Sequence, residues 1–174
     1  MHPLSRRRRL LRRDAQPLRG EADPGDAALN LRAFRAGDED AVAAIWHAGA
    51  SLPGVGPAVL PPIADLCERL RLDLVPHCRI VVAERAGEIV GFAALKLEER
   101  VLDQLFVRAG VLGGGIGRRL LDEAKRAMPE GFTLFTRPGN TRACRFYETA
   151  GLRRFRTDIH PRFGDTIVFY GWTP

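Results

Sequence analysis

A glycine-rich segment, Val111-Leu-Gly-Gly-Gly-Ile-Gly117, carries the clearest chemical signal in the chain and is followed by Arg118 and Arg119. A strand-like run at 101–107 precedes it, and a helical pattern at 116–128 follows. The first amides of a helix lack intrahelical partners and lie at the positive end of its dipole, and glycine lets a ligand approach the main chain closely. With two arginines beside it, such a turn can bind a phosphate or a diphosphate.

Two common nucleotide motifs do not fit these glycines. A dinucleotide fingerprint G-x-G-x-x-G beginning at Gly113 requires glycine where Arg118 stands. A Walker loop beginning at Gly110 requires Lys and then Ser or Thr where Ile116 and Gly117 stand. The segment therefore indicates neither NAD nor ATP binding, and a purely structural tight turn is its alternative interpretation.

A second segment of interest runs Asn140-x-x-Ala-x-x-Phe-Tyr-Glu-x-x-Gly-Leu152. Asn140 is a good N-cap for a helix that Gly151 would end. Tyr147 in this helix offers a hydroxyl that can donate a proton, or it is a core aromatic residue beside Phe146.

The pattern of apolar and turn residues gives the elements that must position these two segments. Strands are predicted at 29–34, 79–84, 88–97, 101–107, 132–136, 152–158 and 165–170, and helices at 38–48, 62–72, 116–128 and 140–150. The order β-α-α-β-β-β-α-β-α-β-β combines a meander with strand-helix-strand crossovers. It predicts an α/β fold with one mixed sheet and helices on both faces.

In the two segments the sequence resembles the GNAT N-acetyltransferase superfamily, in particular its small bacterial members. The family signature Arg/Gln-x-x-Gly-x-Gly/Ala matches Gly115 and Gly117, with Leu112 in place of Arg or Gln. The family pattern N-x-x-A-x-x-F-Y-E-x-x-G-F matches at 140–152 in all but the last position. The resemblance spans about Leu29 to Trp172 and implies a GNAT-like acyl-CoA N-acyltransferase fold in which the two central strands splay apart.

The resemblance also implies roles for individual residues. The diphosphate of acetyl-CoA, the co-substrate, would bind the main chain of the glycine turn. Leu105 and Val107 would pair with the pantetheine arm, and an amide near Phe106 would polarise the thioester carbonyl. Asn140 would bind the arm, and Tyr147 would protonate the departing thiolate. The expected cofactor-binding residues are Leu105, Phe106, Val107, Leu112, Gly113, Gly114, Gly115, Ile116, Gly117, Arg118, Arg119, Asn140 and Tyr147.

The general base is open between several candidates. Asp103 is the best-placed acid, by alternation with Leu105 and Val107 on the same strand, and a structural aspartate is its alternative. His47 and the pair Glu98–Glu99 are further candidates with structural alternatives of their own. No metal is expected, because the three cysteines are widely spaced and none forms a C-x-x-C motif.

The net charge of +6 comes from the N-terminus, where residues 1–19 hold seven arginines and one aspartate. The remaining sequence is balanced, so the folded part shows no bias towards polyanions. We expect a disordered Arg-rich arm at 1–28 and a single domain at 29–174. The arm is interpreted as a dispensable extension, with a nucleic-acid contact or a targeting peptide as alternatives.

The sequence thus predicts an N-acetyltransferase that moves an acetyl group from acetyl-CoA to a primary amine of a small molecule or peptide by direct attack. The alternatives are a catalytically silent CoA-binding module and a nucleic-acid contact through the arm. The loops at 49–62 and 160–165, which recognise the acceptor in the family, are poor in acids and do not indicate a strongly cationic acceptor. No apolar run approaches the roughly 20 residues that span a bilayer, so we expect no membrane partner. The three widely spaced cysteines indicate a reducing compartment, and we expect a cytoplasmic protein. The expected oligomeric state is a monomer or a homodimer.

Overall fold

A single seven-stranded sheet, with strand order β1-β2-β3-β4-β5-β7-β6, organises the protein in a computed structural model that describes residues 28–111 and 114–174. The predicted arm, apart from Ala28, and the predicted site residues Leu112 and Gly113 lie outside the described residues. The elements are β1 (Asn30–Ala33), α1 (Glu39–Ala50), α2 (Ile63–Arg69), α3 (Val75–His77), β2 (Arg79–Arg85), β3 (Glu88–Lys96), β4 (Val101–Val107), α4 (Ile116–Ala127), β5 (Phe132–Thr136), α5 (Thr141–Thr149), β6 (Arg153–Ile159) and β7 (Thr166–Trp172). This order confirms the predicted mixed α/β fold.

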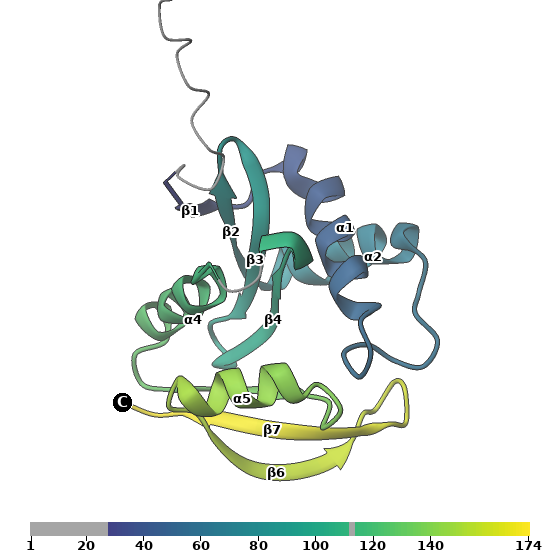
Figure 1. Ribbon diagram of the computed structural model, residues 1–174, viewed down its shortest axis with the longest axis vertical. Helices are drawn as coiled ribbons and strands as arrows, with labels where there is room; N and C mark the ends of the chain where they lie inside the picture. The colour runs from purple at the N-terminus through teal and green to yellow at the C-terminus, as the bar shows by residue number, and fades with distance from the viewer. Residues whose placement is uncertain (1–27, 112–113) are drawn as a thin grey trace, which may run out of the picture.

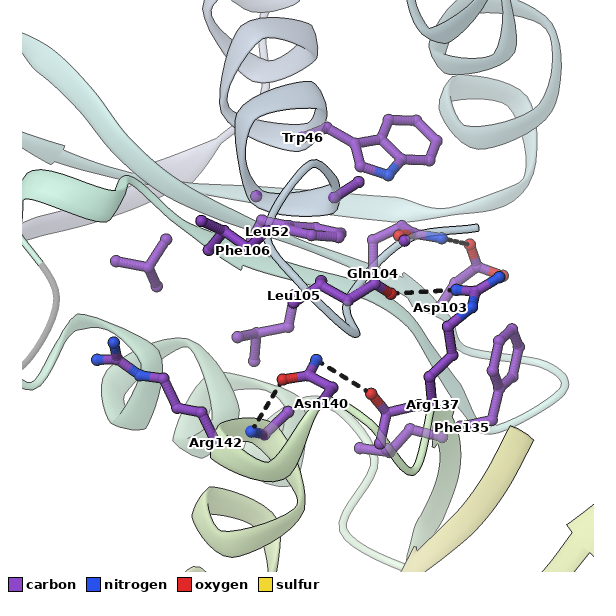
Figure 2. A pocket seen from close by; sticks show the side chains of 18 of the residues that line it. Trp46, Leu52, Asp103, Gln104, Leu105, Phe106, Phe135, Arg137, Asn140 and Arg142 are labelled. Carbon is purple, nitrogen blue, oxygen red and sulfur yellow. Dashed lines mark hydrogen bonds between the residues drawn. The ribbon is translucent and has the colours of Figure 1, made fainter. Parts of the chain in front are cut away.

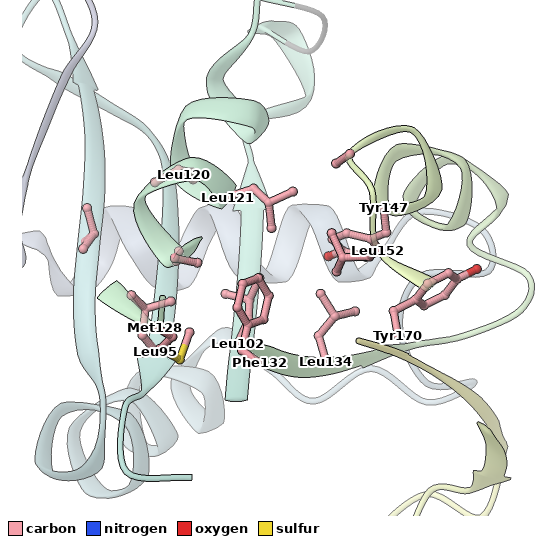
Figure 3. Packing of buried hydrophobic residues seen from close by; sticks show 14 of the residues in the cluster. Leu95, Leu102, Leu120, Leu121, Met128, Phe132, Leu134, Tyr147, Leu152 and Tyr170 are labelled. Atoms are coloured by element: carbon pink, nitrogen blue, oxygen red, sulfur yellow. The ribbon is translucent and has the colours of Figure 1, made fainter. Parts of the chain in front are cut away.

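The helices cover both faces of the sheet (Figure 1). Along β2 the side chains alternate, so that Ile80 and Val82 pack under α1 and α2 while Val81 and Ala83 pack on the side of α4. The cluster on the α4 side continues across β5 and β7 to α5, as Figure 3 shows for Leu121, Leu134 and Tyr170. Burial on two faces explains why β2 and β3 read as nearly continuous apolar runs.

The central strands β4 and β5 run parallel and are joined at one end only. Val101 is in register with Thr133, and the Thr133 amide donates to the Arg100 carbonyl at 2.9 Å. Beyond this point β4 continues its pairing with β3, whereas β5 pairs with β7 along its whole length. The predicted splay of the central strands is therefore confirmed, and it divides the sheet into two halves.

The second helix departs from its predicted end at residue 72, before Pro76. The chain continues as a π-helical segment, Leu70–Leu74, into α3, and the Val75 amide bonds to the Leu70 carbonyl five residues back. Proline has no amide to donate and crowds the preceding turn, so a wider turn accommodates it. The buried side chains of Leu70 and Leu74 hold this turn against the sheet.

Asp38 occupies the predicted N-cap position of α1, but its carboxylate does not bond to that helix. It accepts two hydrogen bonds from the Arg32 guanidinium, at 2.7 and 3.0 Å, and one from the Arg35 amide at 2.8 Å. With 7% of its surface exposed, Asp38 is the one buried acidic residue in the described part of the chain. It ties β1 to the start of α1.

Candidate active site

The splayed strands open into a cleft of about 620 Å³. Trp46 and Phe106 lie on one wall, and Asn140 and Arg142 lie on the opposite wall (Figure 2). The glycine turn closes one end of the cleft, and the loop at 51–62 and the β6–β7 loop lie at the other end. The two ends are called below the glycine end and the acceptor end.

The glycine end is built by the start of α4. Gly115 has a φ of +74°, which other residues rarely adopt, and no atom of the described residues lies within 4 Å of the position that a Cβ would take. The first helical hydrogen bond of α4 runs from the Arg119 amide to the Gly115 carbonyl at 3.0 Å. The amides of residues 116–118 thus lack intrahelical partners, and all three residues line the cleft. Open space around free amides fits a diphosphate.

The two predicted arginines of this turn point in different directions. Arg118 lines the cleft with its side chain half exposed and pairs with Asp122 at 3.1 Å. The Arg119 guanidinium instead donates to the Leu29 carbonyl at 2.9 Å, so the structure does not bring it to the cleft. Gly114 belongs to the glycine turn but is also not among the residues that line the cleft.

Arg85 is a cation of the glycine end that sequence reasoning missed. Two of its guanidinium nitrogens lie 3.6 Å from the position that a Cβ on Gly114 would take. Its Nε is buried without a hydrogen-bond partner among the described residues. Arg85 is the last residue of β2. The turn at Ala86 and Gly87, with φ of 52° and 79°, sets the register of the β2–β3 hairpin, and this register places Arg85 beside the glycine turn.

The register of β4 decides which of its amides face the gap. The Arg108 amide donates to the Val90 carbonyl at 2.9 Å, and Phe106 is in register with Phe92. Because bonded pairs alternate along an antiparallel ladder, the Phe106 amide points into the sheet, towards β3. The amides near Phe106 that face the gap are therefore those of Leu105 and Val107.

Asp103 lies in the cleft for a reason other than the predicted alternation. The register with β3 shifts between Ala94 and Leu95, which leaves Asp103 as an extra residue on β4. Leu105 and Val107 pack on the α4 side of the sheet, whereas the Asp103 carboxylate binds Lys96 at 3.0 Å on the other side. The alternation argument was wrong, because the bulge reverses the direction of this side chain.

The Asp103 carboxylate also accepts a hydrogen bond from the Gln104 side chain at 3.0 Å (Figure 2). It raises the pKa of Lys96 through the hydrogen bond between them. Asp103 is the only carboxylate that lines the cleft in the part of the chain that the structure describes. The structure does not bring His47, Glu98 or Glu99 to the lining.

Tyr147 lies on α5 with only 8% of its surface exposed, and it lines the cleft between the two splayed strands. The centre of its ring lies 5.8 Å from the centre of the Tyr170 ring and 5.3 Å from that of Phe146. No hydrogen bond of its hydroxyl occurs among the described residues. Burial raises the pKa of Tyr147, so the hydroxyl keeps its proton at neutral pH.

Asn140 has a structural role that leaves part of its side chain free. Its Oδ1 accepts from the Ala143 amide at 3.2 Å, which caps α5, and its Nδ2 donates to the Thr136 hydroxyl at 3.2 Å. An amide nitrogen carries two hydrogens, so one donor remains for a ligand in the cleft. The predicted cap is confirmed, and it fixes the direction of this donor.

At the acceptor end, Arg137 links three segments and was also missed by sequence reasoning. Its guanidinium forms a bidentate ion pair with Asp165 of the β6–β7 loop and donates to the Val55 carbonyl at 3.1 Å. Such contacts between distant loops leave no local pattern in the sequence. Arg137 thereby fixes both loops of the acceptor end against the end of β5.

His160 lines the acceptor end as a neutral side chain. Its Nδ1 accepts from the amides of Arg162 and Phe163, at 3.1 and 3.3 Å. Burial and the neighbouring charge of Arg137 lower the pKa of His160. The imidazole proton therefore lies on Nε2, which makes this side chain a hydrogen-bond donor and a poor general base.

No group of three or more His, Cys, Asp or Glu side chains that could hold a metal ion occurs within residues 28–111 and 114–174. The three cysteines are unpaired thiols. Of the helices described, none has both the length and the apolar composition needed to cross a membrane.

Comparison with known proteins gives the fold and the family. YjaB from Escherichia coli, in its apo form, has a TM-score of 0.68 and 21% identity, covering 83% of this chain and 97% of that one. A ribosomal-protein-alanine N-acetyltransferase from Brucella melitensis has a TM-score of 0.62 and 20% identity over 83% and 99% of the two chains. For yncA from Salmonella typhimurium, solved with its cofactor acetyl-CoA, the TM-score is 0.61 and the identity 17%, over 84% and 94%.

At these identities the structures show a shared fold. No curated protein sequence matches the chain significantly. The sequence profile of the acetyltransferase (GNAT) family matches residues 53–152, which include the splayed strands, the glycine turn and the whole of α5. Because this match covers more than half of the chain, the protein belongs to the acetyltransferase (GNAT) family and is an acyltransferase that uses acetyl-CoA.

Proposed function

We propose that the protein transfers the acetyl group of acetyl-CoA to a primary amine of a small molecule or peptide by direct attack of the amine. The gap between β4 and β5 carries the proposal, because free amides line it at one end and a proton donor, Tyr147, lies beside it. The amine would enter from the acceptor end, between the loop at 51–62 and the β6–β7 loop.

The chain offers distinct groups to each part of the co-substrate. The amides of residues 116–118 would bind the diphosphate, with Arg118 and Arg85 as the nearby cations. The gap-facing main-chain groups of Leu105 and Val107 would pair with the pantetheine arm, and the free donor of Asn140 would bind an amide carbonyl of that arm.

In the reaction the amine nitrogen forms a bond to the thioester carbonyl carbon, and the carbon–sulfur bond breaks. A gap-facing amide of β4 would stabilise the negative charge that develops on the carbonyl oxygen. Tyr147 would donate its proton to the departing sulfur, because its hydroxyl is protonated at neutral pH and the residue lines the cleft.

The proton of the attacking ammonium requires an acceptor. Asp103 is our candidate, acting through a water molecule, since it is the one carboxylate in the described lining. Its ion pair with Lys96 at 3.0 Å fixes the carboxylate in position. An Asp103→Asn variant that retained full turnover at all pH values would exclude this role.

Direct attack is favoured over a covalent acyl-enzyme because no cysteine lines the described part of the cleft. The Cys144 thiol points to the Arg137 carbonyl at 3.8 Å. Burial raises the pKa of Cys78 to about 11, which keeps that thiol protonated. We expect Cys144→Ala to retain turnover.

A combined binding and turnover experiment tests the proposal. Acetyl-CoA at 100 times its dissociation constant should stabilise the protein by about 2.7 kcal/mol, which a thermal-shift assay detects. A panel of primary amines, assayed by release of the CoA thiol, should then identify acceptors. Binding without turnover across the panel would favour a silent CoA-binding module, and no binding would overturn the proposal altogether.

The alternative of a nucleic-acid contact through the N-terminal arm needs a separate test. Deleting residues 1–25 should leave turnover unchanged.

A further inference from the structure

The acceptor end of the cleft combines aromatic side chains with arginines. Trp46, Phe135 and Phe163 line it, and Phe135 keeps 39% of its surface exposed there. Arg69 and Arg162 line the same end, from α2 and from the β6–β7 loop. An acceptor bound here meets apolar surface and positive charge together.

Arg69 is held in place by its packing on Trp46 and by one ion pair, with an exposed aspartate. Its guanidinium carbon lies 5.0 Å from the centre of the Trp46 ring, and its Nε is buried with no hydrogen-bond partner in the described residues. The nearest carboxylate, that of Asp73, is 3.7 Å from this nitrogen, and 62% of the Asp73 side chain is exposed to solvent. Burial lowers the pKa of Arg69, and the charge of Arg162 lowers it further.

Two other charged groups at this end, Arg137 and Asp103, are already compensated. Arg137 is paired with Asp165, and Asp103 is paired with Lys96. Arg162 forms no ion pair within the described ranges, and its guanidinium carbon lies 5.5 Å from the centre of the Phe163 ring. Two arginines that repel one another therefore remain at the acceptor end, and the only ion pair between them and the described residues is that of Arg69 with the exposed Asp73.

We propose that the acceptor is an amine that also carries a carboxylate and an apolar group, as an aromatic or aliphatic amino acid does. This inference rests on the proposed acetyl transfer and names its substrate class. Arg69 and Arg162 would bind the carboxylate, since guanidinium groups match its geometry with paired hydrogen bonds. The Nε2 donor of His160 would add a further hydrogen bond, and Trp46 and Phe135 would pack against the apolar group.

Matched amines separate the contribution of the carboxylate from that of the apolar group. Phenylalanine and phenethylamine differ by the carboxylate alone, and leucine and isoamylamine form a second such pair. We expect kcat/KM to be at least about tenfold higher for the amino acid of each pair. A higher kcat/KM for the neutral amines, in the wild-type protein, would overturn the inference while leaving acetyl transfer intact.

Two variants and a matched control locate the effect. Arg69→Gln and Arg162→Gln should each reduce the preference for the amino acid about tenfold, mainly through its KM, and leave the KM of acetyl-CoA unchanged. Arg71→Gln, two residues from Arg69 on the same helical stretch and 59% exposed, should leave the preference unchanged. Because Arg162 is exposed, its variant remains informative even if Arg69→Gln disturbs the packing on Trp46. An unchanged preference in Arg162→Gln and Arg69→Gln would exclude the site.

A binding experiment gives a result that does not depend on turnover. In the presence of coenzyme A, N-acetylphenylalanine should bind more tightly than N-acetylphenethylamine by calorimetry, and the difference should disappear in Arg162→Gln. Should coenzyme A bind while neither product does, or should the neutral product bind as tightly, the inference fails. Should coenzyme A itself not bind, the proposed function fails first.

Discussion

Val101 and Thr133 form the register pair that joins β4 to β5, and past them the two strands belong to different halves of the sheet. A parallel pair would ordinarily continue along both strands, so the main-chain groups that follow Val101 on the gap side are left for another partner. An extended amide-containing chain such as the pantetheine arm fits that requirement. We therefore propose that the co-substrate binds where the sheet is interrupted.

Replacing Tyr147 with phenylalanine removes the proposed proton donor. We expect kcat to fall by at least about 100-fold, while the melting temperature stays close to that of the wild type. The small effect on stability follows because the hydroxyl forms no hydrogen bond within the described residues. Steady-state kinetics and thermal unfolding measure the two effects, and full turnover in the variant would refute the role.

The same residue sets an expectation for pH dependence. Burial raises the pKa of Tyr147 above its ordinary value of 10.0, so the donor stays protonated throughout the neutral and mildly alkaline range. We therefore expect no alkaline decline of kcat below about pH 10 from loss of this proton. A decline centred near pH 8 that disappears in Tyr147→Phe would contradict the assignment.

Gly115→Ala should weaken the glycine end through the main chain. The φ of +74° at this position would cost an alanine roughly 1–2 kcal/mol, although no atom obstructs the added methyl group. Relaxing that strain would turn the first amides of α4 away from the cleft, so we expect weaker acetyl-CoA binding by calorimetry and a lower melting temperature. Gly37→Ala, at an unobstructed position without positive φ, is the control and should match the wild type.

Gly54→Ala should affect the acceptor and spare the co-substrate. Gly54 packs against Gly139 so closely that a Cβ would lie 2.4 Å from the Gly139 carbonyl oxygen, and the loop at 51–62 would have to move. We expect kcat/KM for the amine to fall about tenfold to a hundredfold, with little change in the KM of acetyl-CoA. Gly151→Ala also has a positive φ, +88°, without an obstructing atom among the described residues, and its kinetics should be unchanged. Equal losses in both variants would show that general instability is the cause.

The ion pair between Arg32 and Asp38 gives an expectation for stability against acid. The hydrogen bonds from Arg32 hold the pKa of Asp38 below its ordinary value of 3.8, so the pair stabilises the fold above that pH and loses its effect as the pH falls through the lower, native value. Asp38→Asn should lower the free energy of unfolding by about 1.5–3 kcal/mol at pH 7.

Urea unfolding at pH 7 and at pH 3 measures this effect. The difference between Asp38→Asn and the wild type should narrow at the lower pH, because pH 3 lies below the ordinary pKa of 3.8 and the unfolded chain binds a proton there more readily than the folded protein. Asp40→Asn, at an exposed position in the first turn of α1, should change stability by less than about 0.5 kcal/mol. A difference that is constant with pH would mean that packing, and not charge, explains the loss.

The order of elements could be predicted from the sequence because it depends on local periodicity. The strands at 101–107 and 132–136 were predicted at their observed bounds, since turn residues limit both runs. The end of the second helix was wrong, because burial of Leu70 and Leu74 outweighs the local effect of Pro76. Propensity decides such a boundary only where packing does not.

Parts of the candidate site could not be predicted because they depend on contacts between distant segments. The direction of the Asp103 side chain follows from a bulge against β3, and a bulge changes alternation without any residue that marks it. Arg137 lines the cleft through loop contacts, and a hairpin register places Arg85 beside the glycine turn. Tyr147 and Asn140 were found because their spacing lies within one helix.

A titration of isotope-labelled protein with coenzyme A, followed by the chemical shifts of its amides, reports on each main-chain group of the gap. We expect the amides of Leu105, Val107, Gly117 and Arg118 to shift together and to saturate with a single dissociation constant, while those of β6 stay in place. If these four amides do not respond at millimolar coenzyme A, or if the shifts cluster on β6, the gap between β4 and β5 is not the binding site.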